Sequence, residues 1–84
     1  MKGDKNMKVT FENVLLCDVD SYIFEHKEYI SIIVYQSGRL YRISIPKSIE
    51  DTFTDHVGRT IFVDTIMSVY DGKIKFKYLS FKES

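Results

Sequence analysis

Residues of types that could carry out chemistry are scattered along this chain of 84 and form no recognisable set. His26 and His56 lie far apart, and neither has a cysteine, a second histidine or paired acids at the spacing of a metal site. A catalytic Ser, Thr or Cys needs an activating base and a third group that orients it, and we find no such set. Asp18 and Asp20 could bind a cation, but two acids in a loop are usually only solvated. We therefore predict no enzyme, no metal site and no cofactor.

Cysteine content and charge narrow the class of protein further. One cysteine, Cys17, can form neither an internal disulfide nor a zinc site, and we expect it to be a small buried hydrophobe. Basic and acidic residues number 12 each, so the formal net charge is zero. This balance argues against a surface that attracts nucleic acid everywhere, but it allows one basic face. No segment has the apolar run of a signal peptide or a membrane span, and we expect a cytoplasmic protein with no membrane partner.

The apolar residues are mostly aromatic or β-branched, which favours sheet over helix. Residues 1–6 are polar and are expected to form a flexible tail before a single domain at residues 7–84. The first strand begins at residue 7, and a shift of parity after Asn13 predicts a bulge or bend. Residues 18–27 are expected to form a loop, or strand ends around one. Further strands are predicted at 28–35, 39–45, 59–70 and 73–81, with hairpin turns at 37–38 and 71–72.

One segment has the periodicity of a helix. Ile49, Phe53 and Val57 are spaced four residues apart and would share one helical face. Ser48 can cap its start and Gly58 can end it, and acids in its first turn suit the helix dipole. The predicted helix covers residues 47–57. Five strands with a helix between the third and fourth predict a mostly β fold, an OB-like Greek-key barrel. An SH3-like barrel and an open β-roll are the alternatives.

The predicted hairpin of residues 28–45 has two apolar faces. A turn at 37–38 pairs Val34 with Tyr41, Ile32 with Ile43 and Ile30 with Ile45, and this uniformly apolar set is the predicted core. The opposite face also lacks acids, and it carries Tyr29, Ser31, Ile33, Tyr35, Leu40, Arg42 and Ser44. Exposed contiguous apolar area on a small protein usually marks a contact surface. This face is either covered by another segment of the chain, or a homodimer interface, or a binding surface.

The second hairpin predicts a row of lysines. With the turn at 71–72, Lys73, Lys75 and Lys77 share the outward face with Tyr70. Alternate residues on a strand lie about 7 Å apart, close to the spacing of successive phosphates. The row could equally serve to discourage pairing between strand edges. Acids cluster around residues 18–28 and on the predicted helix, so the two hairpins form a basic side.

The strand order, the aromatic and basic face of residues 28–45 and the segment RISIP at 42–46 resemble small OB-fold proteins of phages and conjugative elements that bind single-stranded DNA. The resemblance implies that bases stack on aromatic side chains of the second and third strands and that basic residues hold phosphates. The implied nucleic-acid-binding residues are Tyr29, Tyr35, Arg39, Arg42, Tyr70, Lys73, Lys75 and Lys77. The absence of Trp and of a basic excess departs from that family.

We therefore predict non-catalytic binding of single-stranded nucleic acid, with DNA preferred over RNA as the partner. The alternative is a protein-interaction module, or a homodimer that assembles through the same Tyr-rich face.

Overall fold

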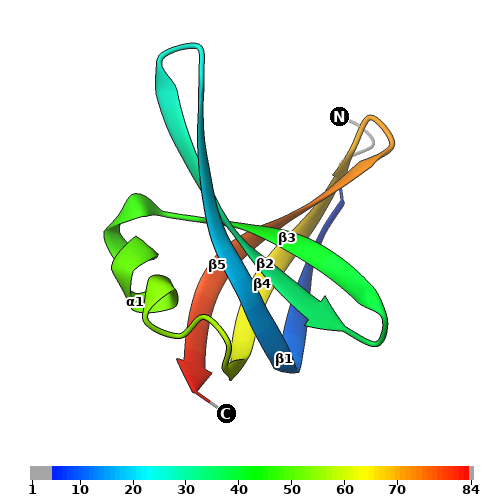
Figure 1. The fold of residues 1–84 in the computed structure, drawn as a ribbon. Helices are drawn as coiled ribbons and strands as arrows, with labels where there is room; N and C mark the ends of the chain where they lie inside the picture. The colour runs from blue at the N-terminus through cyan, green and yellow to red at the C-terminus, as the bar shows by residue number, and fades with distance from the viewer. Residues whose placement is uncertain (1–4, 84) are drawn as a thin grey trace.

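The first strand bends twice and thereby belongs to both halves of a barrel (Figure 1). The structure, a computed structural model, describes residues 5–83. β1 (Lys5–Phe24) pairs with β4 (Thr60–Tyr70) along its first half and with β2 (Lys27–Gln36) along its second. The register shifts between Phe11 and Val14, where Asn13 has a φ of 52°, and again between Leu16 and Asp18. The bend predicted after Asn13 is confirmed.

The barrel closes through a short parallel contact. β3 (Arg39–Ile45) and β5 (Lys73–Glu83) pair at Ile43 with Phe76 and at Ser44 with Lys77, which gives the closed order β1-β2-β3-β5-β4. All other pairings are antiparallel. The predicted five-stranded OB-like barrel, with one short helix between the third and fourth strands, is confirmed. Within residues 5–83, no helix is long and apolar enough to cross a membrane.

Both predicted hairpin registers are confirmed. Val34 lies opposite Tyr41 and Ile32 opposite Ile43, while Met67 lies opposite Phe76 and Ser68 opposite Lys75 in the second hairpin. The turn residues Ser37 and Asp71 have φ near +50° and each precedes a glycine of positive φ, as such tight hairpin turns require. One core is formed by inward side chains of the strands and by Phe53 of the helical segment, with Phe76, Tyr78 and Phe81 of β5 partly buried against it. Its buried members are Phe11, Val14, Leu16, Ile30, Ile32, Val34, Ile43, Ile45, Phe53, Ile61 and Val63.

The helical segment is shorter than predicted and is divided in two. η1 (Lys47–Ile49) is a 3-10 turn and α1 (Glu50–Thr54) a single α-helical stretch, followed by turns to residue 58. Ser48 does not cap either helix, because Pro46 and Ile49 occupy the capping positions. Val57 is 43% exposed instead of sharing the buried face of Phe53. After Thr54 the backbone changes to i→i−3 hydrogen bonds, from the N–H of His56 to the carbonyl of Phe53 and from Val57 to Thr54, and the N–H of Gly58 then donates to the carbonyl of Leu16 on β1 at 2.8 Å.

Of the two structures expected for residues 18–27, a loop or strand ends around one, the second is confirmed. β1 continues to Phe24 and turns at Glu25 and His26, which have φ of 51° and 66°, and β2 begins at Lys27. Positive φ at both positions is typical of a tight hairpin turn, but Asn and Gly are the residues that usually occupy it. Glu-His therefore gave no turn signal. β1 also begins at Lys5, two residues earlier than predicted, and residues 1–4 of the expected tail lie outside the described part.

Phe53 is the side chain that attaches the helical segment to the barrel. It is fully buried, and its ring lies 4.7 Å from that of Phe81 and 5.7 Å from that of Tyr78. We expect Phe53→Ala to lower the free energy of unfolding by about 3–5 kcal/mol, because it removes a buried ring and leaves a cavity. Urea unfolding followed by circular dichroism measures this loss.

The exposed Val57 of the same segment provides the matched control. Val57→Ala should change the free energy of unfolding by less than about 1 kcal/mol, since it removes little buried surface. If Phe53→Ala does not fold, Phe53→Leu replaces it and should still destabilise more than Val57→Ala. Equal stability of the Phe53 and Val57 variants would contradict this role of Phe53.

His56 connects the helical segment to the end of β5. Its Nδ1 lies 2.8 Å from the carbonyl oxygen of Thr52, and its Nε2 lies 3.3 Å from Oε2 of Glu83 without hydrogen-bond geometry. The side chain is only 14% exposed and packs edge-on against Phe81. The hydrogen bond to Thr52 and the nearby Glu83 carboxylate raise the pKa of His56 above its ordinary value of 6.5, and these two effects outweigh desolvation.

Stability should therefore depend on pH through His56. A raised pKa in the folded state means that the protonated ring stabilises the fold fully below pH 6.5, and that this contribution is lost as the pH rises through the folded-state pKa. Urea midpoints should fall between about pH 6 and about pH 8 for the wild type, and less for His56→Gln, which cannot titrate. The same decrease in both proteins would rule out His56 as its source.

Candidate nucleic-acid interface

The end of β1 and the start of β2 project from the barrel as a two-stranded arm, residues 22–29 (Figure 1). The arm carries four exposed large apolar side chains, Tyr22, Ile23, Phe24 and Tyr29. The rings of Tyr22 and Tyr29 stack at 5.4 Å with their planes at 21°, and Nζ of Lys27 lies 5.6 Å from the Tyr29 ring centre. The arm thus presents a preformed aromatic platform with a cation beside it.

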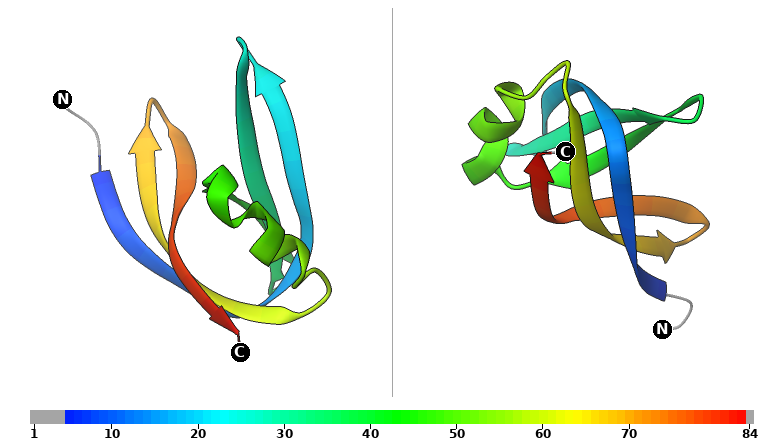
Figure 2. Two further views of the ribbon diagram at one scale, coloured as in Figure 1. Left: turned by 90° about the vertical axis from the view of Figure 1, so that its left-hand side faces the viewer. Right: turned by 90° about the horizontal axis from the view of Figure 1, so that it is seen from below.

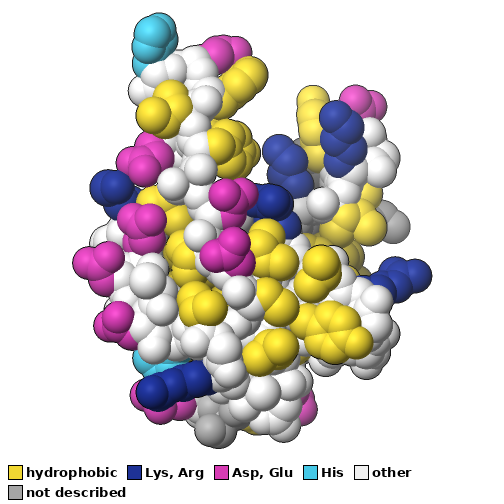
Figure 3. Space-filling view, viewed as in Figure 1, with side chains coloured by type: hydrophobic (Ala, Val, Ile, Leu, Met, Phe, Trp, Pro, Cys, Tyr) yellow, Lys and Arg dark blue, Asp and Glu magenta, His cyan; other side chains and the backbone are white. Residues whose placement is uncertain are grey.

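A groove of about 460 Å³ lies between the arm and the β4–β5 hairpin. These two hairpins project from the same end of the barrel, as Figure 2 (left) shows. Lys27 and Tyr29 line the groove on the arm, Ser44 lines it on β3, and Lys75 and Lys77 line it on β5. In Figure 3, hydrophobic side chains of the arm face basic side chains of the hairpin across this space. The arm wall therefore carries an aromatic ring together with Lys27 and the Lys47-paired Glu28, whereas the β5 wall is positive.

The lysines of β5 lack acidic partners. Lys75 lies opposite Ser68 and Lys77 opposite Ile66, so neither faces an acid across the β4–β5 ladder. Within the described residues, no carboxylate lies within ion-pair distance of Lys73, Lys75 or Lys77. The β5 lysine row, as we call these three residues, therefore keeps its charge available for an anionic ligand.

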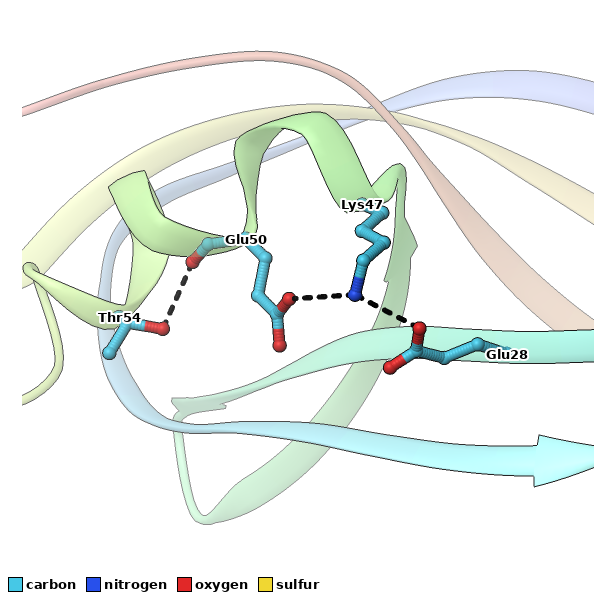
Figure 4. Close-up of polar contacts among 4 residues, drawn as sticks. All are labelled: Glu28, Lys47, Glu50 and Thr54. Atoms are coloured by element: carbon cyan, nitrogen blue, oxygen red, sulfur yellow. Dashed lines mark hydrogen bonds and ion pairs between the residues drawn. The ribbon is translucent and has the colours of Figure 1, made fainter.

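Lys47, at the rim of the groove, differs from the β5 lysine row. Its Nζ lies 2.9 Å from Oε1 of Glu28 and 3.8 Å from Oε1 of Glu50 (Figure 4). The hydrogen bond to Glu28, together with the charge of that carboxylate, raises the pKa of Lys47. Its positive charge is already compensated within the protein, and it contributes little attraction for phosphate.

An ion pair divides the predicted Tyr-rich face in two. Nη1 of Arg42 on β3 lies 2.9 Å from Oδ2 of Asp20 on β1. Since β2 runs between these strands, the two side chains meet above β2, where Ser31 is only 3% exposed. Tyr29 lies on the groove side of this bridge and Tyr35 on the other side. The Tyr-rich face, which was predicted as one surface, is therefore divided into a part around Tyr29 and a part around Tyr35.

The structure brings together only some of the eight predicted binding residues. Tyr29, Lys75 and Lys77 line the groove. Lys73 and Tyr70 face each other at the outer end of the β4–β5 hairpin, on the same outward side as Lys75.

The remaining three predicted residues lie outside the groove. Arg42 is held by Asp20. Tyr35 lies six residues from Tyr29 along β2, about 20 Å away at the rise of an extended strand. Arg39 pairs with Gln36 on the side of the hairpin that carries Tyr41, and thus opposite to Arg42.

Sequence reasoning missed two arm residues and misplaced the cysteine. Tyr22 and Lys27 fell within residues 18–27, where a loop or strand ends around one were expected and no binding residue was named, and the apolar run of residues 22–24 was the available signal for a strand there. Cys17 is exposed, not buried. Val14 and Leu16 point inward after the first register shift, so that Cys17 faces outward by the alternation of the strand.

A second cavity, of about 410 Å³, has a different character. At its centre the Asp64 carboxylate accepts hydrogen bonds from the hydroxyls of Thr10, at 2.6 Å, and Ser80, at 3.2 Å. The Thr10 bond contributes most to the lowering of the Asp64 pKa. This acid is satisfied by its neighbours. No cluster of three or more potential metal ligands occurs among the described residues.

No model of a known protein family matches the chain, and no curated protein matches it. Its function is therefore inferred from the fold and the groove.

Proposed function

We propose that this protein binds single-stranded nucleic acid, without catalysis, in the groove between the arm and the β4–β5 hairpin. The observation that carries the proposal is the pairing of two unlike walls. The stacked Tyr22–Tyr29 pair offers a π-face for bases, and Lys75 and Lys77 offer uncompensated charges for phosphates. Stacking on aromatic side chains and a positive track for the backbone are the two components of single-strand binding.

The arrangement of charges supports a single strand over a duplex. Across the outward face, Asp18 lies on β1 beside the arm, next to Asp20, whose charge is compensated by Arg42, whereas the β5 lysine row lies on the opposite wall. A strand with unpaired bases places phosphates along one edge and bases along the other, which matches these walls. A duplex carries phosphates on both edges, and one edge would meet the acids. The zero net charge of the chain is compatible with this local separation.

We take DNA as the preferred partner and RNA as its nearest variant, because the fold shares its strand order with OB-fold proteins that bind single-stranded DNA. The same resemblance supports a cytoplasmic protein of a phage or conjugative element.

The proposal is tested with a fluorescent oligo-dT of about 20 nucleotides, by anisotropy at about 50 and about 200 mM salt. We expect binding that weakens with salt, because neutralised phosphates release counterions, and much weaker binding to a duplex of equal length. The double variant Lys75→Gln/Lys77→Gln should bind less tightly and depend less on salt. Lys82→Gln, which lies outside the groove, is the control. No binding to the oligonucleotide at either salt concentration would refute the proposed function.

The two tyrosines of β2 separate groove binding from binding elsewhere on the face. We expect Tyr29→Ala to weaken oligo-dT binding by about 1–3 kcal/mol, the usual contribution of one stacked base. Tyr35→Ala is the matched control, since it removes a similarly exposed ring from the same side of the same strand but beyond the Asp20–Arg42 bridge. An equal loss in both variants would mean that the ligand covers the whole face and not the groove.

A further inference from the structure

Beyond the Asp20–Arg42 bridge, three apolar side chains form a row across three strands. Leu15 on β1 lies opposite Tyr35 on β2, and Tyr35 lies opposite Leu40 on β3, so all three point outward side by side. They are 38%, 44% and 65% exposed. None of them lines the groove, and Figure 3 shows hydrophobic side chains gathered on this face below the arm. A contiguous apolar surface of this kind on a small protein marks an interaction site.

The adjacent row has one acid, one aliphatic residue and one base. Asp18 on β1 lies opposite Ile33 on β2, which lies opposite Arg42 on β3. Asp18 and Arg42 are exposed, and Ile33 is half-buried between them. The two rows together form a surface that is apolar along β2, with Asp18 at its β1 edge and Arg42 at its β3 edge. Nη1 of Arg42 is bridged to Asp20 of the same chain, and a second carboxylate can still bind the other N–H groups of the exposed guanidinium.

We propose that a second copy of this chain docks on these two rows, about a twofold axis parallel to β2. Rotation by 180° about this axis places the two copies face to face with their strands parallel, and it exchanges the β1 side of the face with the β3 side. β1 of one copy then lies over β3 of the other. Leu15 meets Leu40 of the partner subunit, and Asp18 meets Arg42 of the partner subunit. Tyr35 lies near the axis and meets its own equivalent. A twofold interface requires self-complementarity of this kind.

The charges select both the occupant and the axis. A twofold axis perpendicular to the strands would place β1 over β1 and β3 over β3, so that the β1 edges with Asp18 would face each other. Only the axis parallel to β2 pairs unlike charges and apolar side chains at the same time. The dimer does not require nucleic acid, and its test uses none.

Sedimentation velocity from low micromolar to sub-millimolar protein tests the dimer. We expect a reversible monomer–dimer equilibrium in the wild type. Leu40→Glu should weaken it by about tenfold or more, because a charge would be buried against the partner. Leu79→Glu introduces the same charge at an exposed leucine of β5, away from the two rows, and should leave the equilibrium unchanged. A monomer at every concentration, or equal effects of the two variants, would overturn the proposal.

Cross-linking tests the axis itself. In a Cys17→Ser background, Tyr35→Cys places a single thiol near the twofold axis, where it can form a disulfide with its equivalent under mild oxidation. We expect a covalent dimer from Tyr35→Cys and much less from Leu79→Cys in the same background. Equal cross-linking of both, or none from Tyr35→Cys in a protein that dimerises, would overturn the proposed arrangement.

Discussion

β1 pairs with β4 at its start and with β2 at its end, and most of the architecture depends on the bends that allow both pairings. A straight strand would keep the same neighbours throughout, but the two register shifts bend β1 and change which side of it is inward. Val14 and Leu16 then reach the core between the two halves of the barrel. The end of β1 is carried beyond the barrel, where it forms the arm with β2. The position of the groove is therefore a consequence of the bend.

The Asp20–Arg42 ion pair organises the outward face in a second way. An exposed ion pair adds little to stability, but its position separates the aromatic end of the face from the apolar rows around Tyr35. On the groove side the free charges are lysines of β5, which suits an anionic ligand. On the other side Asp18 and Arg42 lie at opposite edges of the face, which suits a second copy of the chain. The two proposed interactions thus use different parts of one sheet face.

The registers of the two glycine-containing hairpins were predictable from sequence, whereas the arm was predicted only as one of two alternatives for residues 18–27 and without a register. The Ser37–Gly38 and Asp71–Gly72 turns each fix the register of their hairpin. The pairing of Val34 with Tyr41 and the outward row of β5 lysines therefore followed from the position of each two-residue turn. The Glu25–His26 turn has no glycine or asparagine and gave no such signal. Without the arm, Asp20 could not be placed beside Arg42, and Tyr29 could not be separated from Tyr35. These relations depend on neighbours from distant strands, which local pattern does not encode.

The central claim, that the groove is where a single strand binds, is tested most directly by NMR. Amide chemical shifts of the labelled protein would be followed while unlabelled oligo-dT is added. The account predicts that the largest changes map to the arm around Tyr22 and Tyr29 and to β5 around Lys75 and Lys77, with small changes at Leu40. Changes concentrated at Leu15, Tyr35 and Leu40, or no changes at all, would contradict it.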